Sequence, residues 1–128
     1  MRIATRLDRH GVTLARLGLV VGAALAAWEA FVANDLHLHN PYDKAGHFTV
    51  FYTLTLLSLA AFPRGRVLVM VAVLAAIGGG IELIQALPVV GRDAEWGDFI
   101  ADCLGIGYAV APALAWRVRR LARERSVD

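Results

Sequence analysis

The sequence has few of the features that stabilise soluble or secreted proteins. Cys103 is the only cysteine in 128 residues, so no intrachain disulfide can form. Charged residues make up 19% of the chain and are nearly absent from its long apolar blocks. The stretch 67–81 has no polar face that an amphipathic helix would turn towards water. These absences argue against a soluble helical bundle.

The apolar residues that are present form long blocks. They make up 58% of the chain, whose mean hydropathy is +0.56. Each block is close to the 17–25 residues that a helix needs to cross about 30 Å of hydrocarbon. We therefore predict a single all-α domain, residues 1–128, that is an integral membrane bundle of four transmembrane helices. The helices are expected at about 14–33, 45–62, 67–87 and 98–116, followed by a basic cytoplasmic tail, 117–128.

The charges outside these blocks are separated by sign. Residues 1–16, the turn 63–66 and the tail 117–128 are rich in arginine. The other two connections have Lys44 and Arg92 as their only cations, beside several acids. Because cytoplasmic segments of membrane proteins carry the excess of lysine and arginine, both termini are predicted to be cytoplasmic. The arginines of the tail are interpreted as topology signals, so no nucleic-acid partner is expected.

Carboxylates inside the apolar blocks need a separate explanation. Glu82 and Asp102 lie where an ionisable group costs roughly 2.5–3.5 kcal/mol on membrane-insertion scales. Counted from the ends of their helices, they and His47 lie roughly 5–8 Å below the same boundary. We therefore expect one polar site near the outer membrane face.

Helical spacing predicts how this site is assembled. Glu82 and Gln85 share a face of one helix with small residues, and Asp98 and Asp102 share a face of the next helix with Gly105. Small residues allow membrane helices to approach closely. We expect these two faces to pack together, bringing Glu82 and Gln85 to the aspartates.

Asp43 and His47 are spaced i, i+4 at the start of a predicted helix. The acid would then accept a hydrogen bond from the imidazole and hold it in one tautomer. The alternative is that Asp43 caps the helix while Lys44 and His47 are interfacial anchors. Glu29 either extends towards the interface or joins the site, and His37 and His39 are expected in a solvated loop.

Three short polar motifs follow one another between residues 43 and 105. They are Asp43-Lys44-x-x-His47-Phe48, then Glu82-x-x-Gln85 with Arg92 after it, then Asp98-x-x-x-Asp102-x-x-Gly105. The ordered set resembles the VanZ-like family of small bacterial membrane proteins over about residues 43–107. The positions that match the family pattern are Asp43, Lys44, His47, Glu82, Gln85, Arg92 and Asp98. Asp102 departs from it, because the family usually has asparagine there.

The resemblance implies a multi-pass protein of the bacterial inner membrane with a role in the cell envelope. The family's namesake is linked to low-level resistance to teicoplanin, a glycopeptide directed at the cell wall. The resemblance supplies no reaction, so the chemistry must be inferred from the residues.

The first hypothesis is a lipid-headgroup site. Lys44 and Arg92 would hold phosphate, while an amide, an imidazole and acids would hydrogen-bond a sugar or glycerol. The expected partner is a membrane lipid or lipid-linked cell-wall precursor. The ligand-binding residues would be Lys44, His47, Glu82, Gln85, Arg92, Asp98 and Asp102.

The second hypothesis is a hydrolase or transferase that uses acid–base chemistry. Its candidate catalytic residues are His47, Asp43, Glu82 and Asp98. No serine, threonine or cysteine stands beside His47 in an activated motif, so water or a substrate hydroxyl would be the nucleophile. Whether the chain is an enzyme therefore stays open.

The third hypothesis is a structural polar network. Polar contacts between membrane helices average only about 0.6 kcal/mol, so a network rich in acids would contribute little to the stability of the bundle. No cofactor or metal site is specified by ligand spacing, although a divalent cation would neutralise Asp98, Asp102, Glu82 and His47. The small-residue faces permit a homo-oligomer or another membrane protein as partner.

Overall fold

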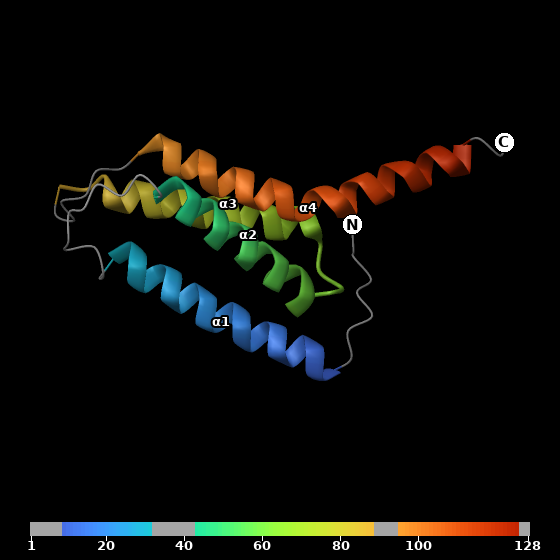
Figure 1. Cartoon of the computed structure of the whole chain (residues 1–128), viewed down its shortest axis with the longest axis horizontal. Helices are drawn as coiled ribbons and strands as arrows, with labels where there is room; N and C mark the ends of the chain where they lie inside the picture. Colours follow the sequence, from blue (N-terminus) through green and yellow to red (C-terminus); the bar gives the residue numbers. More distant parts are fainter. Residues whose placement is uncertain (1–8, 32–42, 89–94, 126–128) are drawn as a thin grey trace.

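The computed structural model describes residues 9–31, 43–88 and 95–125, and within these ranges it contains four α-helices and no strand. The helices are α1 (Arg9–Phe31), α2 (Asp43–Ala61), α3 (Val67–Gln85) and α4 (Trp96–Arg125), arranged as an elongated bundle (Figure 1). The predicted all-α class is confirmed.

Three of the helices are long and apolar enough to cross a membrane: α1, α3 and the Trp96–Trp116 part of α4. Large apolar side chains lie exposed along them, among them Leu14, Leu68 and Leu104. Exposed apolar surface on this scale suits lipid and not water. These three candidate spans indicate a membrane protein.

Helix α2 does not reach the same hydropathy, although it was predicted as a fourth crossing. It has 19 residues and packs against α1, α3 and α4, so it is the central helix of the bundle. Its residues Thr55 and Ser58 are buried within the bundle. The Thr55 hydroxyl donates a hydrogen bond to the Phe51 carbonyl at 2.6 Å. A central helix can carry such polar residues because its neighbours cover them.

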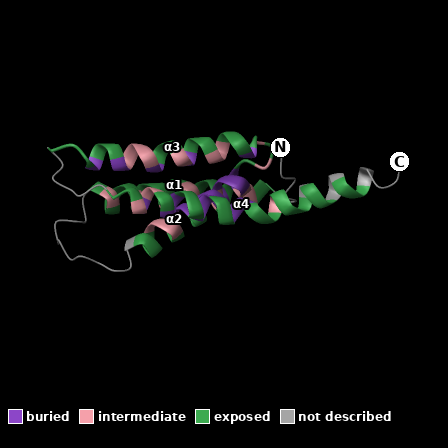
Figure 2. Ribbon diagram, turned by 90° about the horizontal axis from the view of Figure 1, so that it is seen from above, coloured by how far each residue is buried: buried purple, intermediate pink, exposed green. Residues whose placement is uncertain are grey.

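The core is formed mainly where α2 meets its neighbours. Buried Phe51, Leu54, Leu74 and Ile106 pack together from α2, α3 and α4. Figure 2 shows buried residues gathered where α2 and α4 overlap, while the outward face of α3 is exposed. An apolar core along the helices therefore holds α2, α3 and α4 together.

Gly105 sets the distance between α4 and α2. A Cβ atom added at Gly105 would meet the carbonyl oxygen of Phe48 and, at 2.9 Å, the backbone nitrogen of Tyr52. Backbone atoms cannot move aside as a flexible side chain can. Glycine is therefore required for this close crossing.

The predicted packing of α3 against α4 holds only in part. Gly78 lies against Asp102, where an added Cβ would be 2.7 Å from Oδ2, and Gly79 lies against Phe99. Gly105, however, faces α2 and not α3. The expectation for Gly105 was wrong because helical spacing identifies residues that share a face but not the helix that covers it.

Helix α4 extends beyond the other helices. It continues to Arg125, past the predicted helix end near residue 116, so the first part of the basic tail is helical. It contains Pro112, and Figure 1 shows a change of direction where the helix leaves the bundle. A proline inside a helix removes a backbone hydrogen bond and causes such bends.

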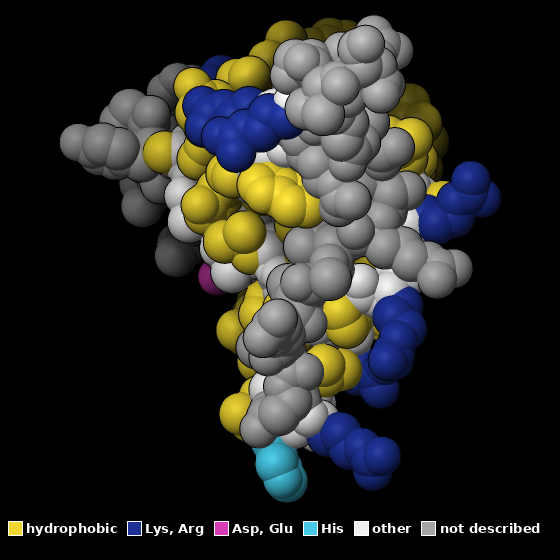
Figure 3. Space-filling view, turned by 90° about the vertical axis from the view of Figure 1, so that its right-hand side faces the viewer, with side chains coloured by type: hydrophobic (Ala, Val, Ile, Leu, Met, Phe, Trp, Pro, Cys, Tyr) yellow, Lys and Arg dark blue, Asp and Glu magenta, His cyan; other side chains and the backbone are white. Residues whose placement is uncertain are grey.

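One end of the bundle is basic. Here α1 begins, α2 turns into α3 and α4 extends outwards, and Figure 3 shows arginine side chains, in dark blue, around this end. The exposed arginines in the described part of the chain are Arg9, Arg16, Arg64, Arg66, Arg119 and Arg123. Arg16 also donates to the Ala61 carbonyl at 3.2 Å, which binds α1 to the end of α2.

Candidate functional site

The candidate site lies at the opposite end, where α1 and α3 end and α2 and α4 begin (Figure 1). Ionisable side chains from α2, α3, α4 and the residue before α4 meet here. We call this group the polar cluster: Lys44, His47, Glu82, Glu95, Asp98 and Asp102. Its acids on α3 and α4 are buried, whereas Lys44 and Glu95 are exposed.

His47 is held by an acid from α4. Its Nδ1 atom lies 2.9 Å from Oδ1 of Asp102, whose side chain is only 1% exposed. Because an ionised carboxylate can only accept a hydrogen bond, this contact favours a proton on Nδ1. The other ring nitrogen, Nε2, lies 3.8 Å from Oδ2 of Asp98.

Glu82 has two carboxyl oxygens in different environments. Oε2 accepts a hydrogen bond from the backbone N–H of Glu95 at 3.1 Å. Oε1 is buried and, among the described residues, has no hydrogen-bond partner. A buried polar atom without a partner is costly and is rare in native proteins, so Oε1 calls for a ligand or a functional explanation.

Lys44 closes the cluster on its exposed side. Its Nζ atom lies 2.6 Å from Oε2 of Glu95 and 3.3 Å from Oδ1 of Asp98. The hydrogen bond to Glu95, followed by the one to Asp98, raises the pKa of Lys44 above its ordinary value. The lysine stem crosses Gly97, where an added Cβ would lie 2.7 Å from Lys44 Cε, so a side chain at this position would displace the lysine.

His47, Glu82 and Asp98 are close enough to share a small ligand. Each offers one nitrogen or oxygen atom, and these atoms lie within 4.8 Å of one another. An imidazole and two carboxylates can bind a metal ion, accept hydrogen bonds from hydroxyl groups, or move a proton.

The predicted ligand-binding residues are brought together in large part. The structure unites Lys44, His47, Glu82, Asp98 and Asp102. The side chain of Asp43, all of Arg92, and the loop residues His37 and His39 lie outside the described residues. The predicted Asp43–His47 pair is therefore untested, and the acids described beside His47 come from α4.

Gln85 is at the same end of the bundle but has a different role. It is buried, and its amide nitrogen donates to the Ala30 carbonyl of α1 at 3.2 Å. This bond links the ends of α3 and α1, whereas the sequence predicted contact with the aspartates. Glu29, in the last turn of α1, is exposed.

Glu95 belongs to the cluster and was missing from the predicted site. Its carbonyl accepts the backbone N–H of Asp98 at 2.9 Å, which places it immediately before α4. The sequence did contain a signal, since Glu95 precedes Asp98 by three residues and both belong to one helical turn. It was overlooked because it lies outside the apolar block.

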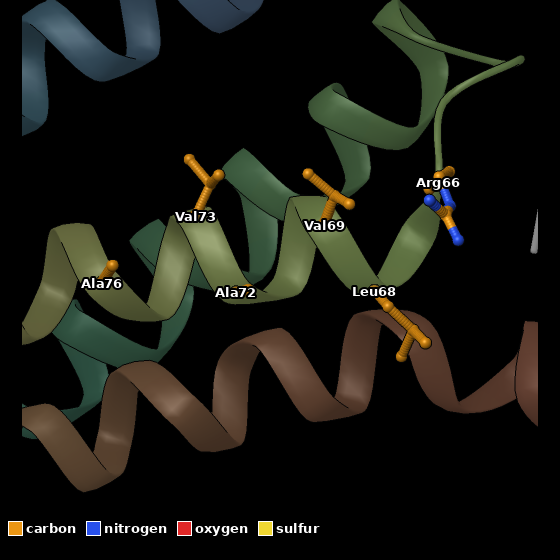
Figure 4. A pocket seen from close by; sticks show the side chains of 6 residues that line it. All are labelled: Arg66, Leu68, Val69, Ala72, Val73 and Ala76. Atoms are coloured by element: carbon orange, nitrogen blue, oxygen red, sulfur yellow. The ribbon is translucent and has the colours of Figure 1, made fainter.

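A concave region lies on α3 near the basic end. It has a volume of about 480 Å³ and is lined by Arg66, Leu68, Val69, Ala72, Val73 and Ala76. Figure 4 shows Val69 and Val73 projecting from one side of α3, with Arg66 at the start of the helix. The lining has no acid or imidazole, so its chemistry suits hydrocarbon and not a reaction.

Comparisons of the chain with family models, with curated proteins and with solved structures found no match. Function is therefore inferred from the chemistry of the polar cluster.

Proposed function

We propose that the chain is a VanZ-like, multi-pass protein of the bacterial inner membrane. In this proposal the polar cluster binds the headgroup of an envelope lipid or of a lipid-linked cell-wall precursor. The observation that carries the proposal is a group of buried acids and an imidazole at one end of an apolar bundle, next to a lysine that is 56% exposed.

The proposed topology has four crossings with both termini in the cytoplasm. Helix α2 counts as the fourth because it is surrounded by α1, α3 and α4, which are apolar enough to span. The arginine-rich end would face the cytoplasm. The polar cluster then lies near the outer face, at the level of lipid headgroups.

The cluster offers complementary groups to a headgroup. The Lys44 ammonium is exposed and can approach a phosphate, while Asp98 and Glu82 can accept hydrogen bonds from sugar or glycerol hydroxyls. A purely structural network is a weaker explanation, because it would leave Glu82 Oε1 buried with no hydrogen-bond partner among residues 9–31, 43–88 and 95–125.

The resemblance to the VanZ-like family connects this site with the cell wall. A protein that holds an envelope lipid at the outer face would change how much of it is available to wall synthesis. We therefore include altered teicoplanin susceptibility in the proposal. Asp102, in place of the usual family asparagine, adds a carboxyl beside His47.

The second candidate function is acid–base catalysis on the same bound lipid. It is favoured by the hydrogen bond from His47 Nδ1 to Asp102, because a histidine oriented by a buried acid is a suitable general base. Catalysis would appear as conversion of the bound lipid in vitro. Binding alone would leave the lipid unchanged over many hours.

The test is native mass spectrometry of the protein released from its own membranes. Wild type is expected to carry a discrete lipid that Glu82→Gln lacks. Glu29→Gln is the matched control, since Glu29 is an exposed acid of α1. Equal lipid on wild type and Glu82→Gln would contradict the proposal.

A further inference from the structure

At the centre of the polar cluster, His47, Asp98 and Glu82 each have one side-chain atom hydrogen-bonded to a described residue and one atom close to the other two groups. His47 Nδ1 is bonded to Asp102, and Nε2 faces Asp98. Asp98 Oδ1 receives Lys44, and Oδ2 is the oxygen 3.8 Å from His47 Nε2.

Glu82 follows the same pattern. Its Oε2 accepts a hydrogen bond from the backbone N–H of Glu95, and its Oε1 is buried with no hydrogen-bond partner in the part of the chain that the structure describes. Glu82 is 7% exposed, so water from the membrane interface reaches this oxygen poorly. An atom from each of Glu82, His47 and Asp98 lies within 4.8 Å of the other two.

A divalent metal ion satisfies this arrangement. Carboxylate and imidazole ligands bind Zn²⁺ at about 2.0–2.2 Å, so ligand atoms around one ion lie roughly 3–3.5 Å apart. Starting from separations of up to 4.8 Å, the three ligand atoms would have to move closer together by at most about 1–2 Å. Metal-binding histidines commonly donate their second N–H to a carboxylate, as His47 does to Asp102.

We propose that His47, Glu82 and Asp98 bind one divalent transition-metal ion, of the type of Zn²⁺ or Mn²⁺. One nitrogen and two oxygen ligands suit these ions better than Ca²⁺, which takes six to eight oxygens. The ion offsets the excess of carboxyls over Lys44 in the cluster. Three protein ligands leave a coordination position open, where a phosphate or hydroxyl oxygen of the headgroup would bind. This last role, unlike metal binding itself, rests on the function proposed above.

The experiment measures metal bound to the full chain in nanodiscs of synthetic phosphatidylcholine. The protein is stripped with EDTA, equilibrated with Zn²⁺ or Mn²⁺ at micromolar concentration, desalted and analysed by plasma mass spectrometry. Wild type is expected to retain about one ion per chain, with excess Ca²⁺ failing to displace it. Wild type that retains no stoichiometric Zn²⁺ or Mn²⁺ overturns the proposal without any variant.

Variants then locate the ion. Glu82→Gln and His47→Ala are expected to weaken binding at least 100-fold, and Asp102→Asn, which acts through His47, by about 10–100-fold. The matched controls Glu29→Gln and His10→Ala alter exposed residues outside the cluster and should bind as wild type does. Circular dichroism verifies that each variant is folded. If folded Glu82→Gln and His47→Ala bind metal as wild type does, the ion is not at this site and the proposal fails.

The metal and lipid proposals can fail separately, because the nanodiscs contain no envelope lipid. Metal binding without a co-purified lipid would leave the ion site standing and contradict the headgroup site. A co-purified lipid that survives EDTA, on a protein that retains no metal, would support the headgroup site and contradict the ion site.

Discussion

Nδ1 of His47 and Oδ1 of Asp102 lie 2.9 Å apart, although the residues are 55 positions apart in the chain. The bond joins α2 to α4 at the polar end of the bundle. It fixes the imidazole with Nδ1 towards Asp102 and Nε2 towards Asp98, both of which lie on α4. Each function considered for the cluster depends on this orientation.

Replacing Asp102 with alanine should destabilise the protein. The change leaves the partly buried His47 Nδ1–H without its Asp102 acceptor, which costs about 1–3 kcal/mol. Asp102→Asn keeps an acceptor and should cost less. Reversible unfolding in mixed micelles measures the free energy of unfolding of both variants. Cys103→Ala, at an exposed neighbouring residue, is the control. A destabilisation by Asp102→Ala no larger than that by Cys103→Ala would contradict the structural role.

Gly105→Ala should weaken the contact between α2 and α4. The added methyl group would meet backbone atoms of Phe48 and Tyr52, and overpacking of this kind costs about 1–3 kcal/mol. Gly107→Ala is the matched control, because no atom of a described residue lies within 4 Å of a Cβ there. Since alanine favours helix over glycine, the control should be neutral or slightly stabilised. The same measurement should give a lower free energy of unfolding for Gly105→Ala than for Gly107→Ala. Equal values would mean that α4 crosses α2 less closely than the structure shows.

Lys44 should titrate above the ordinary lysine pKa of 10.5, because Glu95 and Asp98 accept hydrogen bonds from its ammonium group. A pKa raised by folding means that the stabilisation is complete below pH 10.5 and is lost as the pH rises through the folded-state value. Lys44 is the only lysine, so one NMR signal from labelled lysine reports the titration. Glu95→Gln should lower the midpoint, and an unchanged midpoint would show that the ion pair does not persist in solution.

The proposed topology predicts which end of the bundle is accessible from outside. In a Cys103→Ser background, Trp96→Cys should react with a membrane-impermeant maleimide added to intact spheroplasts. Arg64→Cys, in the turn between α2 and α3, should react only after lysis. The reverse pattern would place the polar cluster in the cytoplasm and remove the link to the outer envelope.

The sequence was sufficient to predict the helices and most of the cluster. Long apolar blocks marked the helices, and counting residues from their ends placed His47, Glu82 and Asp102 in one layer. These inferences succeeded because helix length and rise are fixed by backbone geometry.

The partners of the residues were less predictable. The i, i+4 spacing points from His47 to Asp43, a pair that lies outside the described side chains, and no local spacing points from His47 to Asp102. The bond to Asp102 and the position of Gly105 against α2 depend on the order in which helices pack around the bundle. Several packing orders bury the same faces, so periodicity alone does not select one.

The most direct measurement of the central claim is the lipid carried by His47→Ala and by His10→Ala, beside wild type, after release from their own membranes. Both substitutions remove an imidazole, but His10 is exposed at the start of α1, far from the polar cluster. We predict a discrete envelope lipid or lipid-linked sugar on wild type and His10→Ala, and its loss from His47→Ala. The same bulk phospholipid on all three proteins would contradict a headgroup site at the polar cluster.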